Sequence, residues 1–128
     1  MNPIPNPHPM PLSRQLDLVF REIRDELSAV SSGTLFIHIR NNTIGKFGIR
    51  HLPIIPKNGK IIPDSSPGLS QRHQDAFRLM VIEALKHRRG WTHGEIQIDF
   101  RLKQNVLHAS IVFESNYNLA NLLHTGKT

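Results

Sequence analysis

The 128-residue chain contains no cysteine, which excludes disulfide bonds, a thiol nucleophile and thiolate metal sites. It has no apolar run near the roughly 20 residues that a membrane-spanning helix needs. It also lacks the basic and apolar leader that directs secretion. These absences favour a cytoplasmic protein without a membrane partner. Aromatic residues are scarce, with six Phe, one Trp and one Tyr, so few side chains are available to stack on bases.

No motif for catalysis is present. Gly45 and Gly48 fall inside an alternating segment rather than at a strand-to-helix turn, so they do not form a phosphate loop. The eight histidines are scattered, without the helical spacing of a metal site. His38, Asp99 and His108 could meet on one sheet face and bind metal or relay protons, although separate solvated side chains are the simpler interpretation. We therefore predict a non-enzymatic protein with no cofactor and no metal.

Positive charge exceeds negative charge along the whole chain. The 16 Lys and Arg residues against 10 Asp and Glu residues give a formal net charge of +6 and a pI near 10.3. When the chain is divided after Asp64, each half holds eight basic and five acidic residues, so the excess forms no tail. A basic domain attracts polyanions such as nucleic acid. An evenly basic surface without such a partner is the alternative.

The two halves of the chain repeat one pattern. Each contains a Leu-Ser pair, a Phe-Arg pair that starts seven residues after the Ser, and a glycine that opens an alternating segment ending in Arg. These features lie at Leu12–Ser13, Phe20–Arg21 and Gly33–Arg40, and again at Leu69–Ser70, Phe77–Arg78 and Gly94–Arg101. A second strand-like segment follows each time. The pattern predicts two α-β-β pseudo-repeats, over about 12–51 and 69–113.

Two helices are predicted, and they differ in character. The first spans about Leu12–Val30, with Ser13 as its N-cap and apolar residues at three- and four-residue steps on one face. The second spans roughly Ser70–Arg89 and ends in a basic cluster that complements the negative end of a helix. Eight of the ten residues over 76–85 are apolar, which indicates either central burial or cover by another chain.

Four segments alternate between apolar and polar residues, as strands with one buried face do. The first pair, Thr34–Arg40 and Ile44–His51, is joined at Asn41–Asn42; the second pair is Glu95–Leu102 and Val106–Phe113. We predict an α+β domain, a two-layer αββαββ sandwich. Its four-stranded, mainly antiparallel sheet carries two helices on one face.

Three segments fall outside this αββαββ core. Residues 1–11 carry proline at every odd position from Pro3 to Pro11 and are predicted to form a flexible N-terminal arm. Residues 54–63 are nearly palindromic around Asn58–Gly59, which predicts an inserted β-hairpin that its prolines confine to an edge or a protrusion. The single domain over 12–123 then ends in a short terminal helix, followed by a frayed tail over 124–128.

The polar sheet face and the hairpin form the candidate nucleic-acid surface. Lysine and arginine side chains would contact phosphates, and one aromatic ring would stack on a base. The residues of this set are Phe36, Arg40, Lys46, Arg50, Lys57, Lys60 and Arg101. We therefore predict a small basic binding or regulatory protein that contacts DNA or RNA.

A protein-interaction module, such as an adaptor, a chaperone-like factor or an inhibitor, is the alternative. The apolar second helix would then place Leu79, Val81 and Ile82 in an interface, and the hairpin edges could join a second copy. This alternative predicts a homodimer. The salt dependence of binding distinguishes the two hypotheses, because contacts to phosphates release counterions.

Overall fold

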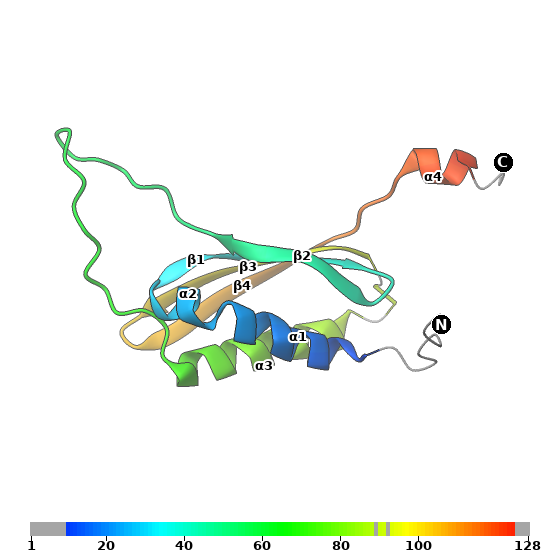
Figure 1. The fold of residues 1–128 in the computed structure, drawn as a ribbon, viewed down its shortest axis with the longest axis horizontal. Coiled ribbons are helices and arrows are strands. Elements are labelled where there is room, and N and C mark those ends of the chain that lie inside the picture. The colour runs from blue at the N-terminus through cyan, green and yellow to red at the C-terminus, as the bar shows by residue number, and fades with distance from the viewer. Residues whose placement is uncertain (1–9, 89, 92, 125–128) are drawn as a thin grey trace, which may run out of the picture.

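A computed structural model describes residues 10–88, 90, 91 and 93–124. The elements in these residues are α1 (Leu12–Glu22), α2 (Arg24–Ser28), β1 (Ser32–Arg40), β2 (Thr43–Arg50), α3 (Gln71–His87), β3 (His93–Lys103), β4 (Val106–Glu114) and α4 (Leu119–His124). The strands form one sheet in the order β2-β1-β3-β4, antiparallel throughout. Figure 1 shows α1, α2 and α3 on one side of this sheet. The predicted α+β class and two-layer αββαββ layout are confirmed.

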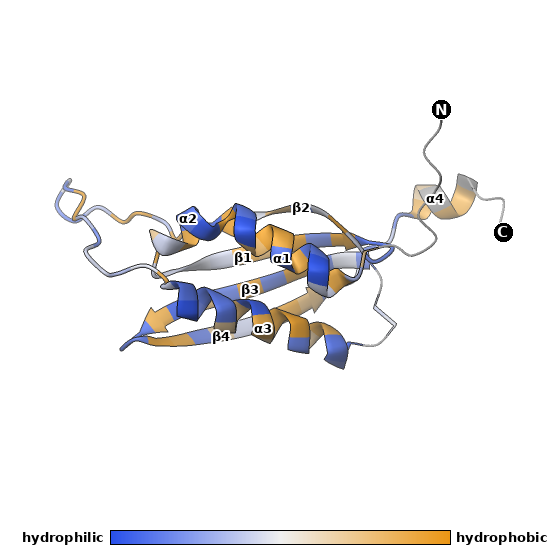
Figure 2. Cartoon of the chain, turned by 60° about the horizontal axis from the view of Figure 1, so that its bottom comes forward, coloured by the Kyte–Doolittle hydropathy of each residue, from blue (hydrophilic) through white to orange (hydrophobic). Residues whose placement is uncertain are grey.

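The core lies between the sheet and the helices. Alternate side chains of β1 and β3 point into it and are fully buried; they include Leu35, Ile37, Ile96 and Ile98. The ring of Phe77 on α3 lies 5.3 Å from that of Phe20 and 5.1 Å from that of Phe100. Aromatic contacts of this kind add about 0.5–1.5 kcal/mol beyond burial. Apolar and polar bands alternate along both long helices (Figure 2), so each presents one apolar side to this core.

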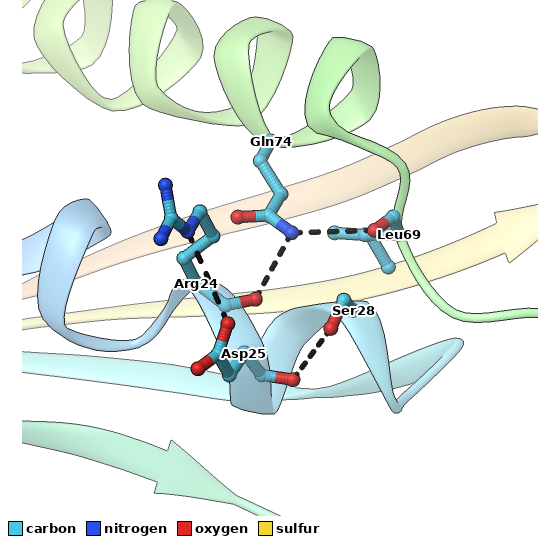
Figure 3. Close-up of polar contacts among 5 residues, drawn as sticks. All are labelled: Arg24, Asp25, Ser28, Leu69 and Gln74. Atoms are coloured by element: carbon cyan, nitrogen blue, oxygen red, sulfur yellow. Dashed lines mark hydrogen bonds and ion pairs between the residues drawn. The ribbon is translucent and has the colours of Figure 1, made fainter.

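The helix predicted over 12–30 is interrupted at Ile23, so the prediction of one continuous helix is wrong there. α1 ends before this residue and α2 starts after it. Gln74 of α3 holds the chain at the interruption, because its side-chain amide donates to the carbonyl oxygens of Arg24 and Leu69, each at 3.2 Å (Figure 3). Gln74 lies 50 positions from Arg24. No local feature of the sequence indicates this contact.

The two Leu-Ser pairs have different roles. The Ser70 hydroxyl accepts the backbone N–H of His73 at 3.2 Å, and His73 Nδ1 accepts the Ser70 N–H at 3.1 Å, so Ser70 caps α3. Ser13, the predicted cap of the first helix, lies inside α1. Pro11 occupies the N-cap position, and no side chain caps this end. The prediction for Ser13 is therefore wrong, because the helix starts at the residue that follows the proline.

Gly33 and Gly94 occupy equivalent places in the two halves. A Cβ at Gly94 would lie 1.8 Å from the carbonyl oxygen of Glu114, the last residue of β4. A Cβ at Gly33 would lie 3.1 Å from the carbonyl oxygen of Arg50, the last residue of β2. In each half, the end of the second strand thus approaches the glycine near the start of the first. The repeated sequence pattern corresponds to a repeated backbone arrangement.

The insertion after β2 is an extended loop that we call the protruding loop, residues 51–68. Its Asn58–Gly59 turn has φ values of 52° and 73°, as a tight hairpin turn requires, and Lys57 pairs with Lys60 across it. Within residues 51–68, all of which are described, this is the one strand-like pair. The hairpin predicted over 54–63 is therefore reduced to its tip, because the prolines on both limbs offer no N–H. Figure 1 shows the loop projecting from the body of the domain.

After β4, the last element in the described residues is α4, which lies away from the sheet (Figure 1). Residues 1–9 of the predicted N-terminal arm and residues 125–128 of the predicted tail lie outside the described residues. In the ranges that are described, no helix is both long enough and apolar enough to cross a membrane.

Candidate nucleic-acid interface

The helices leave one face of the sheet uncovered, and we call it the open face. Because side chains alternate along a strand, residues between the buried positions of β1 and β3 point to this face. Its residues include Lys46, Gly48 and Arg50 of β2, Thr34, Phe36, His38 and Arg40 of β1, Glu95, Gln97, Asp99 and Arg101 of β3, and His108, Ser110 and Val112 of β4. The open face is therefore predominantly polar and charged.

Five of the seven residues predicted to contact nucleic acid come together on the open face; they are Phe36, Arg40, Lys46, Arg50 and Arg101. Lys57 and Lys60 lie instead at the tip of the protruding loop, away from the sheet (Figure 1). The predicted set is thus divided between the open face and the tip of the protruding loop.

A β-bulge in β2 places Lys46 at the edge of the open face. Ile44 and Phe47 are three residues apart, yet both pack against the core. This is possible because Gly45 and Lys46 together lie opposite the single residue His38. In a regular strand, residues three positions apart point to opposite faces, so one of the two apolar side chains would turn toward solvent. The bulge lets β2 keep its core contacts and still present a lysine.

Phe36 lies at the centre of the open face, between Gly48 on β2 and Gln97 on β3. A Cβ at Gly48 would come within 2.8 Å of the Phe36 Cζ atom, so the ring covers the glycine. The guanidinium carbon of Arg50 is 5.8 Å from the ring centroid, and the His38 ring lies edge-on at 6.0 Å. The central aromatic ring is therefore half-buried and flanked by a cation and an imidazole.

Two cross-strand polar pairs flank this centre. The Thr34 hydroxyl donates to Asp99 Oδ1 at 2.5 Å, and His38 Nε2 lies 3.0 Å from Glu95 Oε1. The Gln97 side-chain amide also donates to Glu95 Oε2, at 3.2 Å. Thr34 and Glu95 occupy equivalent positions in the two halves, as do His38 and Asp99, so the pairs follow the pseudo-repeat. Each carboxylate at the centre of the face is thus bound by neighbouring side chains.

The basic residues lie at the two ends of the open face. Arg40 and Lys46 are at one end, while Arg50 and Arg101 are at the other. Arg101 is opposite Ser32, which precedes Arg40 by eight residues (40 minus 32) along β1. At about 3.3 Å per residue, the two ends are roughly 26 Å apart. Glu114 of β4 lies opposite Glu95 on the same face, so these four cations stand against three carboxylates, Glu95, Asp99 and Glu114.

A hollow of about 510 Å³ opens at the Arg101 end of the open face. Its polar lining comes from Ser32, Thr34, Asp99, Arg101, His108 and Ser110. Leu52, near the start of the protruding loop, also lines it, and no pattern in the sequence indicates this position. Guanidinium, imidazole and hydroxyl groups in one hollow can donate hydrogen bonds to phosphate oxygens. His108 was considered from the sequence with His38 and Asp99 for metal binding or proton relay, whereas Ser110 was not named as a site residue, although alternation along β4 places both on this face.

His38, Asp99 and His108 do not converge. His38 is opposite Glu95, four residues from Asp99 on β3, which corresponds to about 13 Å. His108 is opposite Arg101, farther along the same strand. Within the described part of the chain, no group of three His, Asp or Glu side chains is placed to hold a metal ion. The catalytic or metal-binding constellation considered from the sequence is therefore not assembled.

The interface predicted on α3 lies mostly inside the domain. Val81 is fully buried in the core and is not available to another chain, whereas Ile82 is half-buried against the core. Leu79 points outward and is 57% exposed. The helix is apolar over a wide arc because it packs on α1 and α2 as well as on the sheet. Of the three predicted interface residues, Leu79 alone is exposed, Ile82 is half-buried and Val81 is buried.

One carboxyl of the protruding loop is stabilised in its charged form. The Ser66 backbone N–H donates to Asp64 Oδ1 at 2.9 Å, and this bond, together with the Ser66 side chain, lowers the pKa of Asp64. The carboxyl is fully exposed and lies in the loop that leads back to α3. The hydrogen bond between Ser66 and Asp64 shapes this limb of the loop, and Asp64 is not part of the open face.

Comparison with protein-family models, with curated proteins and with solved structures gives no significant match for this chain. The functional argument therefore rests on the open face itself. Its features are a central aromatic ring, an adjacent amide, and cations at both ends. These groups can bind a ligand by stacking, hydrogen bonding and charge.

Proposed function

We propose that the open face binds single-stranded nucleic acid. The observation that carries the proposal is the central Phe36–Gln97 pair with cationic side chains at both ends of the face. A base would stack on the Phe36 ring, and the Gln97 amide would form hydrogen bonds with a base edge. The phosphates on either side would then meet the basic ends, formed by Arg40 and Lys46 and by Arg50 and Arg101.

A single strand suits this face better than a duplex. The face is the surface of a sheet, and the helix on this side, the six-residue α4, lies beyond the end of the sheet instead of on the face (Figure 1). Bases can stack on a side chain only when they are unpaired. The distance of about 26 Å between the basic ends fits several nucleotides of an extended strand, within the range known for other single-strand-binding folds.

The hollow beside Arg101 supports the same proposal. Its volume of about 510 Å³ is within the range of roughly 300–1,000 Å³ typical of ligand sites. Arg101 and His108 offer N–H groups there, and Ser110 offers a hydroxyl. We place one phosphate or sugar of the bound strand in this hollow. The protein would act in the cytoplasm as a non-enzymatic binding or regulatory factor.

Fluorescence anisotropy tests the proposal with labelled single-stranded RNA and DNA of mixed sequence and with the matching duplexes. We expect binding to the single strands at low salt. Four phosphate contacts predict a slope of log K against log salt of about −2.8, from roughly −0.7 per contact. The double variant Arg50→Glu/Arg101→Glu removes two contacts, so its slope should fall to about −1.4. DNA and RNA are compared directly in the same titrations.

Arg72→Glu is the matched control. Arg72 is an exposed arginine near the start of α3, on the helical side of the domain. It makes the same exchange as each of the two substitutions in the double variant but lies away from the open face, so the affinity of the Arg72 variant should remain near that of the unmodified protein. Absence of binding to any single strand at low salt would refute the proposal. So would an equal loss of affinity in the Arg72 variant, because it would indicate a diffuse charge effect.

A second candidate function is a protein-interaction module that acts as a homodimer. The specific observation in its favour is the exposure of large apolar side chains on the protruding loop and around α4. Sedimentation velocity without nucleic acid measures self-association, and the single-strand titrations measure binding, so each candidate has its own test. Self-association together with no binding to any single strand would favour the module as the function.

A further inference from the structure

The protruding loop carries a row of large apolar side chains into solvent. Their exposed fractions are 53% for Leu52, 72% for Ile54, 76% for Ile55, 64% for Ile61 and 67% for Ile62. Figure 2 shows apolar segments along the loop on both sides of its tip. Contiguous exposed apolar surface of this kind is typical of an interaction site.

The loop is anchored firmly at its base. His51 Nε2 lies 2.7 Å from Glu26 Oε2 where the chain leaves the sheet. Where the chain returns, the Leu69 N–H donates to the Leu27 carbonyl oxygen at 3.1 Å, and Leu69 is buried. Both ends of the loop are thus fixed on α2, so its apolar side chains are presented from a defined position.

The loop is suited to contacts through side chains. Pro53, Pro56 and Pro63 have no N–H, so neither limb can extend a ladder of backbone hydrogen bonds with another strand. The exposed isoleucines flank these prolines. A partner would therefore bury the isoleucine side chains against an apolar surface instead of adding a strand.

A second apolar surface lies at the C-terminal end of the described chain. Tyr117 is 81% exposed, Leu119 is 68% exposed and Leu123 is 65% exposed. α4 has six residues, and an isolated helix shorter than about 12 residues is marginal in water. Packing against a partner would stabilise it. Figure 2 shows that α4 is largely apolar.

The loop and α4 are placed so that two copies can cover both. Figure 1 shows them at opposite ends of the sheet, and both project on the side away from α1 and α3. A two-fold axis that brings two open faces toward each other carries the loop of one copy to α4 of the other. The same operation brings the second loop to the second α4, so the contact closes as a symmetric dimer.

We propose that this chain forms such a homodimer, in which the protruding loop of each copy packs on α4 of its partner. Nine large apolar residues of the loop and around α4 are exposed, and each leaves on the order of 100 Å² in contact with water. Together they are close to the roughly 800 Å² per partner that a standard interface buries. The open faces of the two copies would then line the space between them.

Sedimentation equilibrium of the full chain over a wide concentration range tests the proposal without nucleic acid, so its outcome is independent of the proposed binding function. We expect a dimer for the unmodified protein. Ile55→Lys/Ile62→Lys in the loop and Leu119→Glu/Leu123→Glu in α4 should each give a monomer. All four side chains are exposed, and circular dichroism verifies that both variants are folded.

Mixing the two variants provides the decisive result. One end of the mixed dimer joins the lysine loop to the glutamate helix, and the other end is unmodified, so dimerisation should return. If the loop of one copy packed on the loop of the other instead, the variant with lysines in its loop would not regain a partner in this mixture. Failure of the mixture to dimerise would overturn the proposal. An unmodified protein that stays monomeric would also overturn it. Binding of such a monomer to anionic vesicles would show that the apolar residues contact a membrane surface instead.

Leu18→Lys and Leu79→Lys are the matched controls. Leu18 of α1 is 48% exposed and Leu79 of α3 is 57% exposed, both on helices that cover the other side of the sheet. Each exchanges an exposed leucine for a charge, and the proposal predicts that both remain dimeric. A dimer that is lost in the Leu79 variant but kept in the loop variant would place the interface on α3 and overturn the proposal.

Discussion

The ring of Phe36 covers the backbone of Gly48 on the neighbouring strand, so that a Cβ at Gly48 would come within 2.8 Å of the Phe36 Cζ atom. A glycine weakens a strand by itself, yet here it receives the central aromatic ring of the open face. Gly45, three residues earlier in β2, would have no atom within 4 Å of an added Cβ. The two glycines of one strand therefore have different roles: one seats a ring, and the other belongs to the bulge.

Gly48→Ala should lower the free energy of unfolding by about 1–3 kcal/mol, because the new methyl group meets the Phe36 ring. Gly45→Ala, on the same strand, should change it by no more than about 0.5 kcal/mol. Chemical denaturation measures both. The cost of Gly48→Ala should shrink in a Phe36→Leu background, since the ring is then absent. Equal effects at both glycines would contradict the contact.

Ser70→Ala should cost about 0.5–2 kcal/mol of stability, because the hydroxyl that accepts the His73 N–H is lost from the N-terminus of α3. Ser13→Ala is the control from the other half of the pattern. Ser13 is exposed within α1, where alanine is the better helix former, so no loss is expected. Thermal and chemical denaturation of the two variants measure the difference. A similar loss in both would show that Ser13 also acts as a cap.

Gln74→Leu should destabilise the domain by about 1–3 kcal/mol, because the carbonyl oxygens of Arg24 and Leu69 lose their buried donor (Figure 3). Gln71→Leu, three residues earlier, removes an exposed hydrogen bond to Asp75 and should change stability by about 0.5 kcal/mol at most. Denaturation measures both variants. Hydrogen exchange provides a further test, since the amides of α2 should lose protection in the Gln74 variant alone.

Phe36→Leu should weaken the proposed binding of a single strand about 5- to 150-fold, which corresponds to the roughly 1–3 kcal/mol of one stacked base. Leucine keeps apolar contact with Gly48 but offers no aromatic face. The slope of log K against log salt should stay the same, because no charge is removed. Phe47→Leu is the control, since Phe47 lies on the core side of β2. Anisotropy titrations measure both, and an unchanged affinity in the Phe36 variant would exclude stacking at this site.

The sequence predicted the architecture well because the relevant patterns are local. Alternation in Thr34–Arg40 and Glu95–Leu102 identified the two central strands and the side chains that each turns toward solvent. The Asn58–Gly59 dipeptide identified a turn that the chain does form. Five of the predicted nucleic-acid residues fall on one face for the same reason.

The predictions that were wrong concern contacts between distant parts of the chain. The continuous first helix breaks where Gln74 reaches Arg24. Val81, predicted at an interface, is buried because α3 packs on two sides at once. Periodicity within one segment contains no information on such contacts.

The sequence by itself determined the order of helices and strands and the two-sided character of the sheet, because helical and strand periodicity are properties of neighbouring residues. Only the tertiary structure decided that Gly48 seats Phe36, that cations occupy both ends of the open face, and that the loop and α4 project on the same side. These features depend on the register of paired strands and on the direction in which the chain leaves the sheet. Both are set by long-range packing.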